Sequence, residues 1–321
     1  MLIQTLLLVA GLVLVVLGAE WLVDGASGIA RRAGISEFVI GLTIVGFGTS
    51  CPELVVSLTG AFEGIADISI GNVLGSNIFN TLLILGLTAV IAPVTMTSEN
   101  RKKDIPFTLL VTLMFIMCGM SKSFLGLGKA DALSRVEGLV FLTVFVLYII
   151  YCFRTGKDKA EGGTGSSEKT RSALASIGLV LAGLGGLVVG GRLFVDSAVN
   201  IAEALGVSRK FIAITILAGG TSLPELATCI VAAARKKDQL ALGNILGSNI
   251  FNILLILGSS AVVTPLSLAG INPVDVAALA LSAILVLVFA FTGHRDRLDR
   301  WEGALLLAVY AADMGWLFYS L

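Results

Sequence analysis

Long apolar segments separated by short polar stretches run through the whole sequence. A membrane-spanning helix needs about 20 mainly apolar residues. We read ten such segments, at residues 2–19, 37–61, 68–92, 105–120, 136–153, 172–190, 208–234, 240–264, 274–292 and 302–320. The pattern therefore predicts an all-α polytopic membrane protein with ten transmembrane helices.

The placement of Lys and Arg predicts how these segments are oriented, because cytoplasmic loops carry an excess of basic residues. With the N-terminus outside, 16 of the 22 basic residues fall in cytoplasmic loops and 6 fall outside. An even number of spans then places both termini outside, which is an N-out/C-out topology.

A polar stretch divides the ten segments into two sets of five. Residues 154–171 (RTGKDKAEGGTGSSEKTR) are rich in Gly, Ser and charge, a composition typical of flexible linkers. We predict a cytoplasmic linker there, between a first five-helix half at 1–153 and a second at 172–321.

The two halves repeat each other in sequence. A shift of 172 positions aligns Gly18–Pro93 with Gly190–Pro265 without a gap, and about 35 of the 76 pairs are identical. Five spans per half is an odd number, so the second half enters the membrane from the opposite side. Inverted repeats of this kind are common in secondary transporters, with the binding site near the membrane midplane. An inert duplicated scaffold is the alternative, but the identity is concentrated in polar residues inside the spans.

Two glutamates stand deep inside predicted spans two and seven, where an ionisable residue costs at least a few kcal/mol and indicates function. Glu53 and Glu225 each end a Thr-Ser-X-Pro-Glu motif, and the two motifs are related by the repeat. Proline lacks a backbone N–H and clashes with the preceding turn, so each motif predicts a broken helix with freed carbonyl oxygens. Broken helices occur at membrane depth where the freed groups line a cavity or are buried in protein.

The next span of each half adds more oxygen donors. Ser76 with Asn80, and Ser248 with Asn252, are spaced i, i+4 and so share a helix face. Carboxylate, hydroxyl, amide and carbonyl oxygens are hard ligands, and Ca²⁺ takes about 6–8 of them. Two carboxylates give a charge of −2, which one Ca²⁺ or two monovalent cations would neutralise.

Composition excludes several other classes of protein. With 22 basic and 22 acidic residues the chain has no net charge, which argues against nucleic-acid binding. One His and four scattered Cys do not make a zinc ribbon or a disulfide framework. The spans offer no Ser–His or paired Asp arrangement for hydrolysis, so we do not expect an enzyme.

The repeated motifs resemble a known family. TSCPEL and TSLPEL, each followed by GNxLGSNIFN, are similar to the α-1 and α-2 repeats of the calcium/cation antiporter superfamily, and most of all to prokaryotic sodium/calcium exchangers. In this chain the motifs occupy 46–80 and 218–252. The resemblance covers nearly the whole chain, including the ten spans and the N-out/C-out topology.

The resemblance implies a set of cation ligands. Glu53 and Glu225 would form the central Ca²⁺ site, which Na⁺ can also occupy. The other implied ligands are the side-chain or backbone oxygens of Thr49, Ser50, Thr221, Ser222, Ser76 and Ser248, the backbone carbonyls of Gly46 and Ala218, and the amides of Asn80 and Asn252.

Two departures from the family pattern affect the expectation. Some members, including the potassium-dependent branch, carry Asp at the position of Asn252, so the amide weakens the case for K⁺ co-transport. The linker of about 18 residues leaves no room for the regulatory calcium-binding domains of animal homologues.

The sequence therefore predicts a secondary antiporter that exports Ca²⁺ by using the Na⁺ gradient, through alternating access. A Ca²⁺/H⁺ exchanger is the main alternative, since neighbouring carboxylates also carry protons, and a cation channel is a weaker one. We expect no cofactor, with Ca²⁺ and Na⁺ bound as substrates. We also expect the lipid bilayer as the partner, a functional monomer, and a location in the cell membrane of a prokaryote.

Overall fold

The computed structural model describes residues 1–126, 130–156, 172–207, 218–294 and 296–320. Most of the predicted linker at 154–171, and the start of the predicted segment at 208–234, lie outside these residues. The described part is almost entirely helical, and its strands are four two-residue pieces.

The α-helices, in chain order, are α1 (Leu2–Ala33), α2 (Glu37–Ile40), α3 (Gly46–Thr49), α4 (Cys51–Phe62), α5 (Ala66–Ile78), α6 (Leu85–Ile91), α7 (Ile105–Gly119), α8 (Ser121–Leu125), α9 (Arg135–Gly156), α10 (Ala173–Ala204), α12 (Ala218–Gly220), α13 (Leu223–Ala234), α14 (Asp238–Ile250), α15 (Gly258–Val263), α16 (Pro273–Phe289) and α17 (Arg300–Ser320). Four π-helical segments join or precede them: η1 (Gly41–Val45), η2 (Phe79–Ile84), η3 (Asn100–Asp104) and η6 (Phe251–Leu257).

Each predicted apolar segment falls on a helix or on a series of joined helices. Within the described residues, five helices are long and apolar enough to cross a membrane, and the count is six if the bent pair at Glu37–Thr49 and Cys51–Phe62 forms one span. The other predicted segments fall on α7, α12 with α13, α16 and α17, of which α13 and α16 are shorter apolar helices. The protein is an all-α polytopic membrane protein, and the count of ten spans stays a prediction.

Short antiparallel strand pairs join loops that the predicted topology puts on the same side of the membrane. β1 (Val94–Thr95) pairs with β4 (Arg297–Leu298), both in predicted cytoplasmic loops. β2 (Ala132–Leu133) pairs with β3 (Leu266–Ser267), both in predicted outer loops. The pairings agree with the predicted alternation of the spans.

The contacts divide the chain into two compact units that cut across the sequence repeat. The first unit contains residues 1–52 and 151–244, and the second contains 53–150 and 245–321. Each unit therefore combines segments from both halves of the sequence. The division into five-helix halves at 1–153 and 172–321 remains a prediction.

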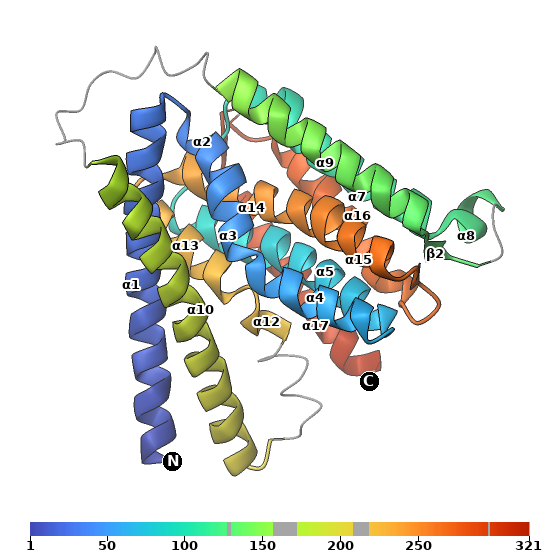
Figure 1. Cartoon of the computed structure of the whole chain (residues 1–321), viewed down its shortest axis with the longest axis horizontal. Coiled ribbons are helices and arrows are strands. Elements are labelled where there is room, and N and C mark those ends of the chain that lie inside the picture. The colour runs from blue at the N-terminus through green and yellow to red at the C-terminus, as the bar shows by residue number, and fades with distance from the viewer. Residues whose placement is uncertain (127–129, 157–171, 208–217, 295, 321) are drawn as a thin grey trace. The chain divides into compact units, whose positions relative to one another are not determined.

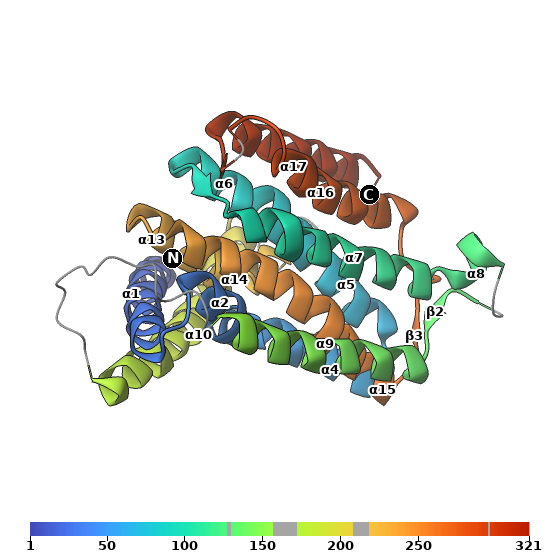
Figure 2. The same ribbon diagram turned by 90° about the horizontal axis from the view of Figure 1, so that it is seen from above.

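In the first unit, the long helices α1 and α10 pack against each other in antiparallel directions (Figures 1 and 2). Gly11, Gly18 and Gly25 are spaced by seven residues and face the α10 backbone. A Cβ added at Gly18 would lie 2.8 Å from the Leu187 nitrogen and 2.9 Å from the Gly183 oxygen. Small residues allow this close approach of two membrane helices.

Ion pairs join the end of α13 and the residues after it to α1 and α2 in the same unit. The Arg235 guanidinium lies 2.5 Å from the Asp24 carboxylate and 3.3 Å from that of Glu20. The Lys237 ammonium lies 2.9 Å from the Glu37 carboxylate. These side chains are all partly exposed, so each pair contributes about 1 kcal/mol or less.

The second unit packs its helices around a buried, largely apolar interior. α17 packs against α6 and η2, and α16 packs against α7 and α5 (Figure 2). At the interface of α6 with α17, the Gly86 and Gly303 backbones touch, since a Cβ added at Gly303 would lie 2.7 Å from the Gly86 oxygen.

Substitution of Gly18 by Ala tests the α1–α10 packing. The new methyl group would overlap the α10 backbone, so we expect Gly18→Ala to lower the free energy of unfolding by about 1–3 kcal/mol. Gly178→Ala on α10 is the matched control, because a Cβ there would meet no described atom within 4 Å. Helix propensity should make that control neutral or stabilising by up to about 1 kcal/mol. Thermal unfolding in detergent measures both, and equal losses would contradict the packing.

Asp104, just before α7, provides a test by pH. Burial raises the pKa of this carboxyl to about 6, against the lowering effects of a hydrogen bond from Asn100 and the charge of Lys103. The folded protein binds this proton more tightly than the unfolded chain, so stability falls as the pH rises from about 4 to 6. Asp104→Asn should remove this slope and raise stability at pH 7 by about 2 kcal/mol. Melting temperatures between pH 4.5 and 7.5 test this, and an unchanged slope would contradict it.

Candidate functional site

The helix predicted over 37–61 breaks at Ser50, between α3 and α4 (Figure 1). Ser50 has φ −83° and ψ 7°, and the repeat-related Ser222 before α13 has φ −89° and ψ 8°. Both values lie in the sparsely populated bridge region, where active-site residues are often found. Pro52 and Pro224 explain the breaks, because a proline fits the first turn of a new helix but cannot continue the preceding one.

Each break places a buried glutamate in the first turn of the following helix. Glu225, in α13, is fully buried, and its Oε1 accepts a hydrogen bond from the Ser50 hydroxyl at 2.9 Å. Ser50 stands three residues before Glu53 in the sequence. A buried carboxylate needs such donors, because an uncompensated charge in a low-dielectric interior is strongly unfavourable.

Glu53, in α4, is also buried, and its main chain is held by the second unit. Asn72 Nδ2 donates to the Glu53 carbonyl oxygen at 3.1 Å and to the Ser57 hydroxyl at 2.9 Å. The bond ties the first turn of α4 to α5, so the backbone around Glu53 is fixed by a side chain from another helix.

The repeat-related contact occurs in the first unit. Asn244, the counterpart of Asn72, donates to Cys229, the counterpart of Ser57, at 3.2 Å. Its Oδ1 lies 3.1 Å from the Thr49 hydroxyl, which is also 3.1 Å from the Val45 carbonyl oxygen. Asn72 and Asn244 are not among the residues predicted from the sequence, although the asparagine shared by the two GN motifs was a signal for them.

The remaining predicted ligands on α5, α14 and their continuations are buried in the second unit. Ser76 and Ser248 are at most 2% exposed, and Asn80 and Asn252 are at most 1% exposed. Asn80 and Asn252 lie at the start of η2 and η6, and such π-helical segments are frequent at functional sites. Their Oδ1 atoms accept no hydrogen bond from any described residue, which leaves them available to a cation.

The remaining three predicted ligands lie just before the two helix breaks. Thr221 is half-buried, and its hydroxyl makes no hydrogen bond within the described part of the chain. The Gly46 carbonyl accepts the Ser50 backbone N–H at 3.1 Å and lies 3.4 Å from the Thr49 hydroxyl. Ala218 is the first residue of α12.

The chemistry of this set is that of hard oxygen donors. No group of three or more His, Cys, Asp and Glu that could hold a metal ion is present among the described residues. Two buried carboxylates accompanied by hydroxyl and amide oxygens suit Na⁺ and Ca²⁺ better than soft transition metals.

The fold and these residues define a polytopic membrane protein with repeated, buried cation-ligand motifs. The sodium/calcium exchanger protein family matches residues 3–154 and 175–319. The chain belongs to this family, which confirms the resemblance found in the sequence.

Individual relatives match over most or all of the chain. The sodium/calcium exchanger MaX1 of Methanosarcina acetivorans is 32% identical, over 98% of both chains. The inner membrane protein YrbG of Escherichia coli is 39% identical, over 83% of this chain and 81% of its own. A solved structure of the sodium-calcium exchanger NCX_Mj is 34% identical with a TM-score of 0.84, over 98% of both chains.

Substitution of Ser50 by Ala tests the hydrogen bond to Glu225. It should leave a buried carboxylate oxygen short of a donor and lower the free energy of unfolding by about 2 kcal/mol. Ser69→Ala is the matched control, because it removes a buried hydroxyl bonded to the neutral Ser57 carbonyl at 2.6 Å. We expect about 1 kcal/mol for the control. Unfolding without Ca²⁺ compares the two, and equal losses would show that the carboxylate does not depend on Ser50.

Proposed function

We propose that this protein exchanges Na⁺ for Ca²⁺ across the membrane by alternating access and normally exports Ca²⁺. The observation that carries the proposal is the repeated broken helix, which puts a buried glutamate, Glu53 or Glu225, directly after each break. Membership of the sodium/calcium exchanger family supports the same function. The protein is then a transporter, and its ions are substrates.

Charge balance explains why such a pair of glutamates couples two ions. Two carboxylates carry a charge of −2, which either one Ca²⁺ or two Na⁺ neutralise. A neutralised site can be buried, whereas an uncompensated double negative charge opposes burial. The protein therefore changes conformation with ions bound and resists doing so without them, which is the requirement for exchange.

The proposed ligands are those that the motifs contain. Glu53 and Glu225 would bind Ca²⁺ or Na⁺ directly, with the oxygens of Thr49, Ser50, Thr221, Ser222, Ser76, Ser248, Asn80 and Asn252 and the carbonyls of Gly46 and Ala218 completing the sites for both ions. Burial of the carboxylates, serines and asparagines supports this assignment.

The remaining expectations belong to the same proposal. The protein would span the plasma membrane of a prokaryote ten times, with both termini outside, and would function as a monomer. The likeness to the inner membrane protein YrbG supports this location. α1 and α10 would move together during transport, which their backbone-to-backbone packing supports.

Radiolabelled Ca²⁺ uptake into proteoliposomes tests the exchange. Vesicles loaded with Na⁺ and diluted into a Na⁺-free bath should accumulate Ca²⁺, and a protonophore should not prevent it. Glu53→Gln and Glu225→Gln should each reduce uptake by more than about tenfold, since loss of one unit of charge and one ligand oxygen costs over ~1.4 kcal/mol of binding.

A matched control is Glu137→Gln. Glu137 accepts from the Ser134 backbone N–H and hydroxyl, both at 2.7 Å, in a capping box where glutamine serves equally well. This variant should transport like the wild type.

Uptake driven by a pH gradient without Na⁺ would indicate a Ca²⁺/H⁺ exchanger, and uptake without any trans cation would indicate a channel.

A further inference from the structure

Four buried asparagines of the second unit form a crossed pair of hydrogen bonds. Asn252 donates from Nδ2 to Asn77 Oδ1 at 2.8 Å, and Asn80 donates from Nδ2 to Asn249 Oδ1 at 3.3 Å. Positions 77 and 249, and positions 80 and 252, are each related by the 172-residue shift. The same contact is therefore made twice, each time between the two halves of the sequence.

These bonds determine which atom of Asn80 and Asn252 is left for a ligand. Each of the two amides uses its nitrogen to donate within the crossed pair, so its oxygen is on the other side of the planar group. Both oxygens are buried and accept no hydrogen bond from the described residues. A buried acceptor without a partner is unfavourable, and a cation would compensate it.

The two accepting asparagines are themselves held, but in different ways. Asn77 donates from Nδ2 to the Asn249 main-chain oxygen at 3.2 Å. Asn249 donates from Nδ2 to the Thr81 hydroxyl oxygen at 2.8 Å. The repeat counterpart of Thr81 is Ile253, which has no hydroxyl, so the two halves differ here. Thr81 therefore holds the nitrogen of the Asn249 amide, a contact that its repeat counterpart cannot make.

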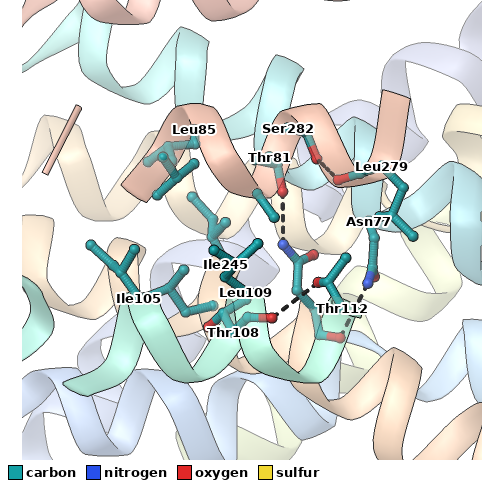
Figure 3. Close-up of a pocket in the computed structure, with 14 residues that line it drawn as sticks. Asn77, Thr81, Leu85, Ile105, Thr108, Leu109, Thr112, Ile245, Leu279 and Ser282 are labelled. Carbon is teal, nitrogen blue, oxygen red and sulfur yellow. Dashed lines mark hydrogen bonds between the residues drawn. The ribbon is translucent and has the colours of Figure 1, made fainter. Parts of the chain in front are cut away.

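These residues line a small cavity with room for about one water molecule (Figure 3). Thr81, Thr108, Thr112 and Ser282 surround it. Thr112 donates its hydroxyl to the Thr108 carbonyl and Ser282 donates to the Leu279 carbonyl, so these hydroxyls are satisfied within their own helices. Thr81 differs from them, because its oxygen accepts from an asparagine of another helix.

We propose that Asn77 and Asn249, with Thr81 supporting Asn249, are positioning residues that turn the amide oxygens of Asn80 and Asn252 toward the transported cation. The proposal rests on the proposed function, since it assumes a cation site at these oxygens. Asn77, Asn249 and Thr81 do not themselves bind the ion. Their loss should weaken cation binding while leaving the fold intact.

Ca²⁺ binding by the purified full-length chain in detergent tests this directly, with thermal unfolding measured in parallel. Thr81→Val keeps the side-chain volume but removes the acceptor for Asn249, and should raise the Kd for Ca²⁺ about fivefold, as expected for one hydrogen bond. Thr81→Ser keeps the hydroxyl and should restore the wild-type Kd. Asn249→Leu, which removes the acceptor for Asn80, should raise the Kd at least as much.

Thr112→Val is the matched control, since it makes the same change in a buried threonine of the same cavity. It should shift the Kd by less than about twofold. A Thr81→Val variant that loses thermal stability like Thr112→Val but keeps the wild-type Kd would overturn the positioning role. A wild type that binds Ca²⁺ without exchanging it would overturn the exchange function alone, and a wild type that binds neither Ca²⁺ nor Na⁺ would overturn both.

Discussion

The structure depends on the need to satisfy polar groups inside a helical membrane protein, where water does not reach them. Glu53 and Glu225 are buried, and each follows a helix break that proline imposes. The surrounding side chains compensate these groups: Ser50 donates to the Glu225 carboxylate, and Asn72 holds the main chain at Glu53. In an apolar environment each unformed hydrogen bond costs free energy. The polar residues are therefore arranged in hydrogen-bond networks that leave few donors without an acceptor.

The internal sequence repeat produces these hydrogen-bond networks in pairs. The contact of Asn72 with Ser57 is repeated by Asn244 with Cys229, with sulfur in place of oxygen. The crossed asparagine bonds repeat in the same way, from Asn80 to Asn249 and from Asn252 to Asn77. Repeated polar contacts of this kind support the proposed alternating access, in which equivalent groups serve each side of the membrane in turn.

Packing in the α1–α10 pair has a different physical basis. Here the helices approach each other through glycines, with backbone against backbone. An interface of small residues holds two helices through van der Waals contact and needs no hydrogen-bond network. The hydrogen-bonded polar networks and the closely packed helix pair are thus built from different kinds of residue.

The sequence by itself determined the membrane class, the helical segments, the internal repeat and the motif residues, because apolar length, proline and local spacing act within one helix. It predicted the site residues from Gly46 to Asn80 and from Ala218 to Asn252 by type and position. Only the tertiary structure showed that Asn72 and Asn244 support the broken helices, that four asparagines cross-link the two halves, and that glycines join α1 to α10. These contacts join residues 15 to 195 positions apart. They depend on how helices pack, and the pattern along one helix carries no information about which partner its side chains will meet.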